Sequence, residues 1–371
     1  MMPHSSLKPR RPQAGRAAGP RQPHRLGSYG PPGATAGTMA AAEAGHAFRL
    51  LDVFAERKHQ GNQLLVLVDQ AAALDDAQLL AITREINFAE SAFICGSDPD
   101  GAVRVRIFTP EYEVPFAGHP TLGLAFVAAS LGLAAADGSL TLRLNPRLGG
   151  GDVGVTRGDD GVWWMLQPPP KFIDPLPVGQ LAGLVPNWEA VVDATRLTDG
   201  ALVPEVSTGL PYLLIPVKDA AALAAVELPQ GGEAKLEEIG RSKTTHPLQL
   251  HSSLYFYHRA GEAAGGVDAD GGGGSGGAVR FCSRMFCFEQ GVWLEDAATG
   301  SAAGCLAAQL AQHCPAELPA SIEQGVQMGR PSALQIDGAA PGEGAGKDMW
   351  EVRVGGRVVP VASGRWGGDD G

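Results

Sequence analysis

The chain has no apolar run long enough to cross a lipid bilayer. Its best candidate, Thr121–Ala136, has sixteen residues and includes a serine and glycines, whereas a spanning helix needs about 20 apolar residues. The 371 residues are 44% hydrophobic and 19% charged, values typical of a soluble globular chain with room for two domains. We therefore expect no membrane partner.

Cysteine is scarce and follows no ligand pattern. The five cysteines form no CxxC pair and no zinc spacing with histidine: Cys95, Cys282, Cys287, Cys305 and Cys314. An odd number without a secretory signal favours a reducing compartment, so we expect free, mostly buried thiols in a cytoplasmic protein.

Several cofactor and catalytic motifs are also missing. No GxGxxG follows a predicted strand with an acidic residue about 20 positions later, and GxxxxGK[ST], HExxH and GxSxG do not occur. The sequence predicts chemistry without a cofactor or metal.

Acidic residues are missing from the first 38 positions, which hold six basic residues and are rich in Pro, Gly and Ala. Such a segment is expected to be disordered. It fits an organellar transit peptide or a start site placed too early, with Met39 as the true start. The remaining 23 basic and 40 acidic residues give a charge of −17, which argues against a nucleic-acid partner.

In the rest of the chain, the same order of predicted secondary-structure elements occurs twice. Strands are predicted at Phe48–Phe54, Leu64–Val68, Ser91–Ile94 and Val103–Phe108, with a helix at Asp75–Glu85. A Gly/Pro turn then opens a helix that is apolar nearly all round, which belongs inside a wrapping of strands.

The second copy repeats this order. Strands are predicted at Tyr212–Val217, Leu250–Tyr257 and Val279–Phe286, before a Gly/Thr/Ser turn and a helix of small residues in "EDAATGSAAGCLAAQLAQH". The Gly-rich stretch Ala263–Ala278 and the stretch Ala339–Lys347 are predicted surface loops.

The two glycine turns are the first candidate site. Gly118 and His119 lie at one predicted helix start, and Gly300 and Ser301 lie at the other. The first N–H groups of a helix lack partners and attract anions, so two facing starts could hold a carboxylate. Ordinary capping and turn geometry explain the same residues.

Three titratable residues add candidate chemistry. Glu90, in "NFAESAF", has apolar neighbours whose burial would raise the pKa of its carboxyl towards the range of a general acid or base. His119 could shuttle a proton, and Asp296 could be a catalytic acid or cap the second helix. A surface glutamate and a structural histidine are the alternatives, and the neighbouring Glu295 competes with Asp296 for its role.

Six segments, in this order, resemble the PhzF-like proteins of the phenazine biosynthesis family: "DVFAERKHQGNQLLVLVD", "REINFAESAFI", "RIFTPEYEVPFAGHPTLG", "SRMF", "EDAATGSAAG" and "QGVQMGRPS". The resemblance covers about Phe48 to Ser363. It implies the diaminopimelate epimerase fold, an α/β architecture of two pseudo-symmetric halves, each a central helix wrapped by a mostly antiparallel sheet. The expected parts are an extension at 1–45, a first half at 46–166 completed by 356–366, and a second half at 167–355 with an insertion at 263–278.

The resemblance also implies roles. Glu90 becomes the acid/base, His119 and Asp296 its polar partners, and Ser301 with the N–H groups at Gly118 and Gly300 part of the substrate wall. Related racemases use one cysteine from each half, and neither turn has one at the working position, which favours a proton shift by a single base.

The activity implied is a cofactor-independent isomerisation of a small carboxylate such as trans-2,3-dihydro-3-hydroxyanthranilate. Two alternatives stay open: a family member that only binds other proteins, and an amino-acid racemase. Relatives commonly form homodimers, so a homodimer is compatible with the resemblance.

Overall fold

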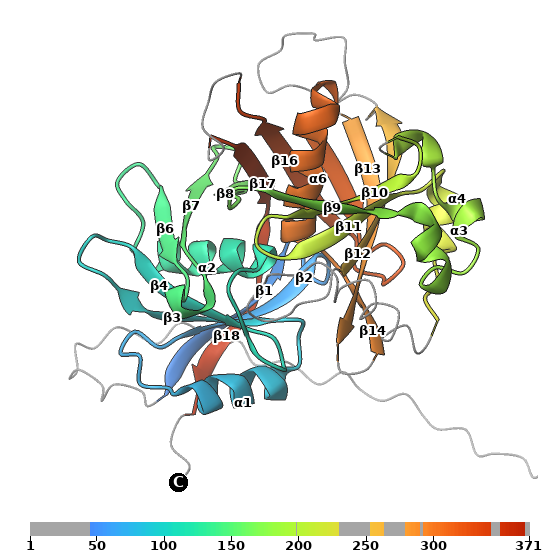
Figure 1. The fold of residues 1–371 in the computed structure, drawn as a ribbon. Helices are drawn as coiled ribbons and strands as arrows, with labels where there is room; N and C mark the ends of the chain where they lie inside the picture. The colour runs from blue at the N-terminus through green and yellow to red at the C-terminus, as the bar shows by residue number, and fades with distance from the viewer. Residues whose placement is uncertain are drawn as a thin grey trace, which may run out of the picture. The chain divides into compact units, whose positions relative to one another are not determined.

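The computed structural model describes residues 45–197, 199–229, 253–262, 279–289, 292–342 and 349–367. Figure 1 shows two long buried helices, α2 and α6, each with its own group of strands. The predicted basic extension up to residue 44 and the Gly-rich insertion at 263–278 lie outside the described residues, as do residues 343–347 of the second predicted loop.

The elements around α2 come first along the chain. In order they are β1 (His46–Val53), β2 (Asn62–Val68), α1 (Asp76–Ile86), β3 (Ser91–Ser97), β4 (Val103–Phe108), β5 (Glu113–Val114), α2 (Gly118–Ser130), β6 (Leu140–Arg143), the 3-10 turn η1 (Pro146–Leu148), β7 (Asp152–Arg157) and β8 (Trp163–Leu166). The predicted strands and the predicted helix at Asp75–Glu85 are confirmed, with ends that move by a few residues.

The elements around α6 follow. They are β9 (Lys171–Pro177), η2 (Val178–Gly183), α3 (Trp188–Val191), η3 (Ala194–Arg196), β10 (Leu202–Ser207), β11 (Pro211–Pro216), α4 (Ala220–Ala224), β12 (Ser253–Glu262), β13 (Val279–Glu289), β14 (Val292–Asp296), α6 (Gly300–His313), η4 (Pro315–Glu317), β15 (Ala320–Gln324), β16 (Ser332–Ala339), β17 (Glu351–Gly356) and finally β18 (Val358–Trp366). The first three residues of the strand predicted at Leu250–Tyr257 lie outside the described part of the chain.

Strand pairing repeats in the two groups. Around α2, β1–β2 is antiparallel, β2–β3 parallel, β3–β4 antiparallel, β4–β6 parallel, and β6–β7 and β7–β8 antiparallel. The series from β10 to β17 has the same signs in the same order, with β11–β12 and β13–β15 as its parallel pairs. The duplicated order seen in the sequence is therefore a duplicated topology, mostly antiparallel as expected.

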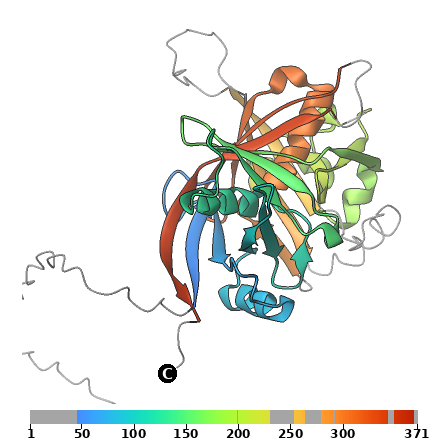
Figure 2. The ribbon, with the colours of Figure 1, turned by 90° about the vertical axis from the view of Figure 1, so that its left-hand side faces the viewer.

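Two strand pairings among the described residues join the groups. β18 runs antiparallel beside β1, with Leu50 opposite Ala362, and Figure 2 shows these red and blue strands side by side. β17 pairs with β8, Gly355 lying opposite Trp164. The last strand thus returns to the sheet around α2, while residues from 44 onward form one compact unit, so the domain limits stay a prediction.

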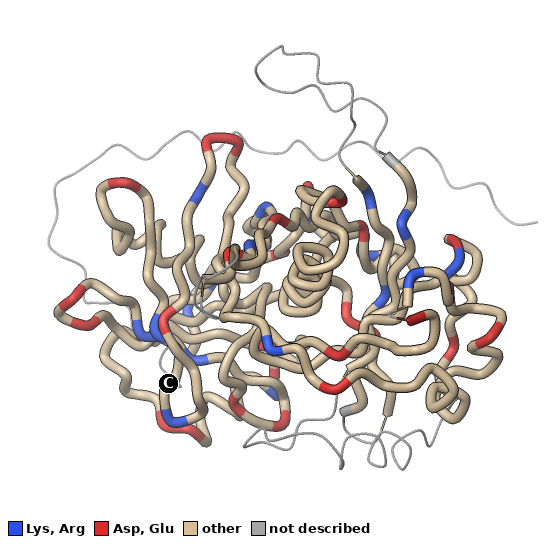
Figure 3. Tube along the Cα trace, turned by 45° about the horizontal axis from the view of Figure 1, so that its top comes forward, with Lys and Arg blue, Asp and Glu red and all other residues tan. Residues whose placement is uncertain are grey.

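The two central helices lie in the core because they have almost nothing polar to expose. Neither α2 nor α6 contains Asp, Glu, Lys or Arg, and ten of the thirteen residues of α2 are buried. In Figure 3 the acidic residues lie mostly in loops and turns. Charge at the helix starts must therefore come from the surrounding strands and loops. No helix in the described ranges is long and apolar enough to cross a membrane.

Candidate active site

The starts of α2 and α6 touch each other. A Cβ built on Gly118 would lie 2.6 Å from Gly300 Cα and 2.7 Å from the Ser301 backbone N. A Cβ on Gly300 would lie 3.1 Å from Gly118 Cα and 2.8 Å from Met165 Cε. Real Cβ atoms do not approach backbone as closely as a Cβ on Gly118 would, so Gly118 has to be glycine, whereas a Cβ on Gly300 would require the Met165 side chain and Gly118 to shift. The facing helix starts expected from the sequence are present.

Glu90 and His119 meet beside this contact. Helix α1 ends at the C-cap Asn87, which has a left-handed φ of 54°, and the chain then turns so that Glu90 directly precedes β3. The Glu90 Oε2 atom lies 3.7 Å from His119 Nε2, and the side chains are 18% and 3% exposed. This distance is longer than a hydrogen bond, and Nε2 has no hydrogen-bond partner among the described residues. The two groups therefore lie side by side without a hydrogen bond between them.

His119 is neutral at physiological pH. Burial lowers the pKa of its imidazole from 6.5 to about 3, and a hydrogen bond to the Gln63 backbone opposes this only in part. A neutral imidazole can accept or donate one proton through its open nitrogen. His119 is thus suited to orienting a polar substrate atom without adding a fixed charge.

Asn62 connects His119 to Asp296, and the sequence analysis did not identify it. Its Nδ2 atom lies 3.1 Å from His119 Nδ1, 2.7 Å from Asp296 Oδ1 and 3.0 Å from the Ala298 carbonyl oxygen. The two amide hydrogens are donated to Asp296 and the Ala298 carbonyl, and the role of His119 Nδ1 depends on the tautomer of the imidazole. Asn62 lies in the "HQGNQ" part of a family-like segment, the one signal that pointed to it.

Asp296 is held from both sides. Thr299 Oγ1 donates to its Oδ2 at 2.6 Å, and Asn62 donates to its Oδ1. Burial raises the pKa of Asp296 from 3.8 to about 6, although the Thr299 and Asn62 bonds oppose the shift. The capping role weighed from the sequence is not seen, because α6 is capped at Thr299 without a side-chain bond. The neighbouring Glu295 forms an ion pair with Arg284 at 2.8 Å. Glu295 is therefore bound in a salt bridge, and Asp296 is the carboxylate that contacts the site residues.

Ser301 faces the other flank of the helix contact. Its Oγ lies 2.7 Å from the Tyr212 hydroxyl, and its carbonyl accepts from Thr208 Oγ1 at 3.1 Å. Burial raises the pKa of Tyr212 well above its usual value, so Tyr212 keeps its proton. Tyr212 had been identified only as part of a predicted strand. The structure thus brings all six predicted site residues to one junction and adds Asn62 and Tyr212.

The thiol of Cys305 lies beside this junction, 3.6 Å from Thr208 Oγ1. Cys305, one turn along α6 from Ser301, is fully buried, and burial raises the pKa of its thiol to about 12. A thiol in this state supplies almost no thiolate. Within the described ranges, no group of His, Cys, Asp and Glu residues has a metal-binding arrangement.

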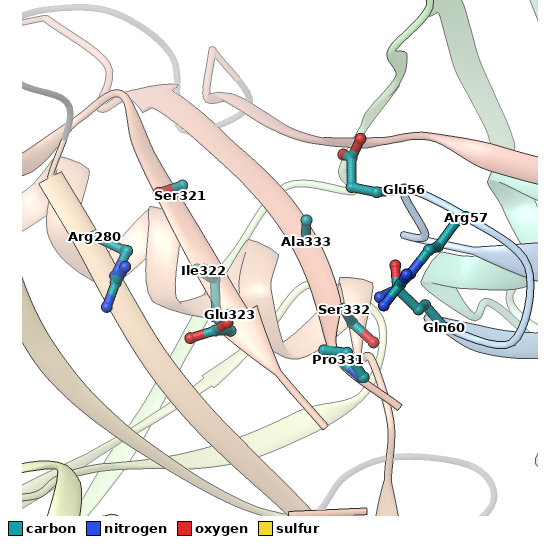
Figure 4. Close-up of a pocket in the computed structure, with 10 residues that line it drawn as sticks. All are labelled: Glu56, Arg57, Gln60, Arg280, Ser321, Ile322, Glu323, Pro331, Ser332 and Ala333. Atoms are coloured by element: carbon teal, nitrogen blue, oxygen red, sulfur yellow. The ribbon is translucent and has the colours of Figure 1, made fainter. Parts of the chain in front are cut away.

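A cavity of about 430 Å³ lies on one flank of the junction, beside the loop between β1 and β2 (Figure 4). Arg57 and Gln60 of this loop reach towards Ser332 of β16. Glu90, His119 and Asp296 do not line it. Deeper in the same flank, Gly61 N donates to the Pro331 carbonyl at 3.1 Å. On this flank, the loop between β1 and β2 is therefore bonded directly to the group of strands around α6.

The free energy of unfolding should depend on pH because the pKa of Asp296 differs between the folded and the unfolded chain. The folded chain keeps this proton at pH values where the unfolded chain has lost it, because folding raises the pKa to about 6. The stabilising contribution is complete below about pH 4 and is lost as the pH rises through about 6, a change of up to about 3 kcal/mol. Asp296→Asn cannot ionise, so its free energy of unfolding relative to the parent should increase over that window.

Urea titrations at a series of pH values measure this difference. His119 is present in both chains, so its own titration cancels. Asp159→Asn, in the exposed turn between β7 and β8, is the matched control and should keep a constant difference from the parent. An equally constant difference for Asp296→Asn would mean that the carboxyl is not desolvated.

The starts of α2 and α6 meet, with polar groups around them, inside a strand topology that is repeated in the two groups. The phenazine biosynthesis-like protein family (PhzC-PhzF) matches residues 51–280 and 276–364. The chain therefore belongs to this family, and the resemblance noted in its sequence is confirmed.

Proteins of similar sequence are named as isomerases. A trans-2,3-dihydro-3-hydroxyanthranilate isomerase of Pseudomonas aeruginosa is 32% identical over 324 residues, covering 86% of this chain and 99% of that protein. An uncharacterized isomerase of Mesorhizobium japonicum is 32% identical over 329 residues, covering 86% of this chain and 97% of its own length. The chain is accordingly an isomerase of this family.

Solved structures show the same fold. A predicted epimerase from Pseudomonas aeruginosa aligns with a TM-score of 0.62 at 33% identity, covering 87% of this chain and 100% of that one. A probable proline racemase from Agrobacterium radiobacter aligns with a TM-score of 0.51 at 13% identity over 87% of this chain and 93% of that one, a likeness of fold alone. The predicted α/β epimerase-like architecture is confirmed.

Proposed function

We propose that this isomerase moves a proton from one carbon to another within a small ring carboxylate of the trans-2,3-dihydro-3-hydroxyanthranilate type. Glu90 takes the proton from the first carbon and returns it to the second, so no atom is gained or lost. The observation that supports this most is the row Glu90, His119, Asn62 and Asp296 at the contact of two helix starts. One carboxylate near one unpartnered imidazole nitrogen matches a shift by a single base.

The other groups have supporting roles in this proposal. The substrate carboxylate is placed near Ser301 and the N–H groups at Gly118 and Gly300, where the helix dipoles favour negative charge. Charge that develops on the ring during transfer is stabilised by these fixed dipoles. Asp296, held by Asn62 and Thr299, donates or accepts a proton at a polar substituent, which its pKa of about 6 permits near neutral pH.

The relatives support the substrate class without fixing the substrate. The Pseudomonas aeruginosa relative is named for the dihydrohydroxyanthranilate reaction, while the Mesorhizobium relative is an isomerase of unassigned substrate. A racemase with two thiol bases receives no support, because Cys305 is buried and its thiol pKa is raised. A purely protein-binding role does not explain a desolvated set of acid and base groups.

Deuterium wash-in tests the proposal. Trans-2,3-dihydro-3-hydroxyanthranilate and a set of related small ring carboxylates are incubated with the full chain in D₂O and followed by NMR. We expect at least one acid to isomerise and to gain deuterium at the carbon that receives the proton. Absence of both isomerisation and exchange across the set would contradict the proposal, and loss of activity with iodoacetamide would favour thiol chemistry instead.

A further inference from the structure

Because the topology is duplicated, the contact between α2 and α6 has two equivalent sides, here called flanks. One lies beside the β1–β2 connection and the other beside the β10–β11 connection, and the two connections differ in length. In the first, the loop Phe54–Gly61 between β1 and β2 bonds the opposite group of strands: Arg330 Nε donates to the Gly61 carbonyl at 2.8 Å. In the second, the equivalent connection between β10 and β11 is only the short turn Thr208–Leu210. The shorter turn leaves a larger space than the longer loop does.

That space is a cavity of about 1000 Å³, here called the flank cavity. It lies between the loop from β6 to β7 and the connection from β8 to β9, and Phe116, Gln167, Lys171, Phe172, Ser207 and Pro211 are among its lining residues. The volume is at the upper end of the range for pockets that bind small organic molecules. Glu90, His119, Asp296 and Ser301 do not line it, so it differs from the proposed active site.

One buried donor of this cavity has no acceptor. Gln167 is only 4% exposed, and its Oε1 lies 3.1 Å from Thr208 Oγ1, whose single hydrogen is shared with the Ser301 carbonyl. Its side chain is fixed against α6, because a Cβ on Gly304 would lie 2.6 Å from the same Oε1. Within the described ranges, Nε2 has no hydrogen-bond partner. A buried amide N–H without an acceptor costs about 1–3 kcal/mol, which a bound acceptor would relieve.

The remaining lining indicates the rest of the ligand. No hydrogen bond or ion pair joins the Lys171 ammonium to a residue that the structure describes. Asp152 and Asp174 also line the cavity; Arg143 binds Asp152 at 2.8 Å, and Asp174 also has a partner. The aromatic rings of Phe116 and Phe172 with several prolines supply flat apolar walls. A free cation, an unpaired N–H and apolar walls together suit an organic carboxylate on a planar apolar body.

We propose that the flank cavity is a second binding site, which takes a planar aromatic or conjugated carboxylate with its carboxylate on Gln167 Nε2 and Lys171. The site lies against the β8–β9 connection, which joins the two groups of strands, and it is separate from the proton-transfer groups. Occupancy therefore does not require turnover.

Binding of 2-naphthoate to the full chain, measured by isothermal titration calorimetry, tests this inference. We expect saturable binding that Gln167→Leu weakens about tenfold or more, since a hydrogen bond to a charged group is lost. Lys171→Met should weaken it about two- to fivefold, as expected for an exposed charge pair. Lys218→Met, another exposed lysine outside the cavity, is the matched control and should leave the affinity unchanged.

A further variant separates this site from the active site. Ser301→Ala should leave 2-naphthoate binding intact, and Gln167→Leu and Lys171→Met should leave isomerisation intact. Binding lost in Ser301→Ala but kept in Gln167→Leu would place the acid in the active site and overturn the inference while leaving the proposed function standing. No saturable binding up to about 1 mM would also overturn it. Should Gln167→Leu fail to fold, Lys171→Met, on an exposed side chain, still decides the outcome.

Discussion

Replacing Glu90 with Gln should slow proton transfer by a factor of about 10² to 10⁴, the usual contribution of a positioned acid or base. Gln keeps the shape of the side chain and its polarity but cannot accept a proton from carbon. The substrate carboxylate is expected to bind at the helix starts, so KM should change little while kcat falls. Initial rates of isomerisation and of deuterium incorporation measure the two parameters.

A matched variant controls for the loss of a carboxylate. Glu85→Gln changes an exposed glutamate on α1, five positions before Glu90, and should keep the parent rate. Glu90→Asp retains the acid but withdraws it by about one methylene, so it should recover part of the lost activity. If Glu90→Gln turns over like the parent and like Glu85→Gln, the proton carrier is another residue.

The fold could be predicted from local patterns because its main elements carry strong ones. Helix α2 is apolar on every face and therefore has to be central, and the branched residues of β2 and β4 mark strands without tertiary information. Pairing between distant strands could not be derived this way. That β18 returns to β1 came from the family resemblance, since nothing local to either strand specifies the partner.

The site was predictable only in part, for a related reason. Gly118 and Gly300 mark two helix starts in the sequence, but their contact is a property of the assembled fold. Local residues favoured a surface role for Glu90, and the resemblance reversed that interpretation. Asn62 was missed because its partner Asp296 is 234 positions away. An asparagine next to a glycine has many local explanations, and its contacts with His119, Asp296 and Ala298 are visible only in three dimensions.

The contrast between Glu295 and Asp296 shows what tertiary contacts add. Adjacent residues of a strand point to opposite faces, so one of the two carboxylates had to face away from the junction. Arg284 takes Glu295 in a bidentate pair, and Asp296 turns to Asn62 and Thr299. The sequence held both candidates, and the strand's alternation together with Arg284 decides between them.

Gly118→Ala should strongly destabilise the chain. Its methyl group would lie 2.6 Å from Gly300 Cα and 2.8 Å from Gly300 C, atoms of backbone that cannot rotate away. Relief requires the starts of α2 and α6 to separate, which also moves Met165 and the core around it. We expect a loss of 3 kcal/mol or more in the free energy of unfolding, at the upper end of overpacking effects.

Separation of the two helix starts should also lower the isomerisation rate, because His119 and Ser301 directly follow Gly118 and Gly300 and would move with them. Any Gly118→Ala chain that folds should therefore show reduced turnover, and its loss should exceed what its unfolded fraction explains. Urea denaturation and isomerisation rates on the same preparation measure both. Gly154→Ala is the control, since a Cβ there meets no atom within 4 Å, and it should be neutral or stabilising by up to about 1 kcal/mol. A Gly118→Ala chain as stable and active as Gly154→Ala would show that the two helix starts are not in contact.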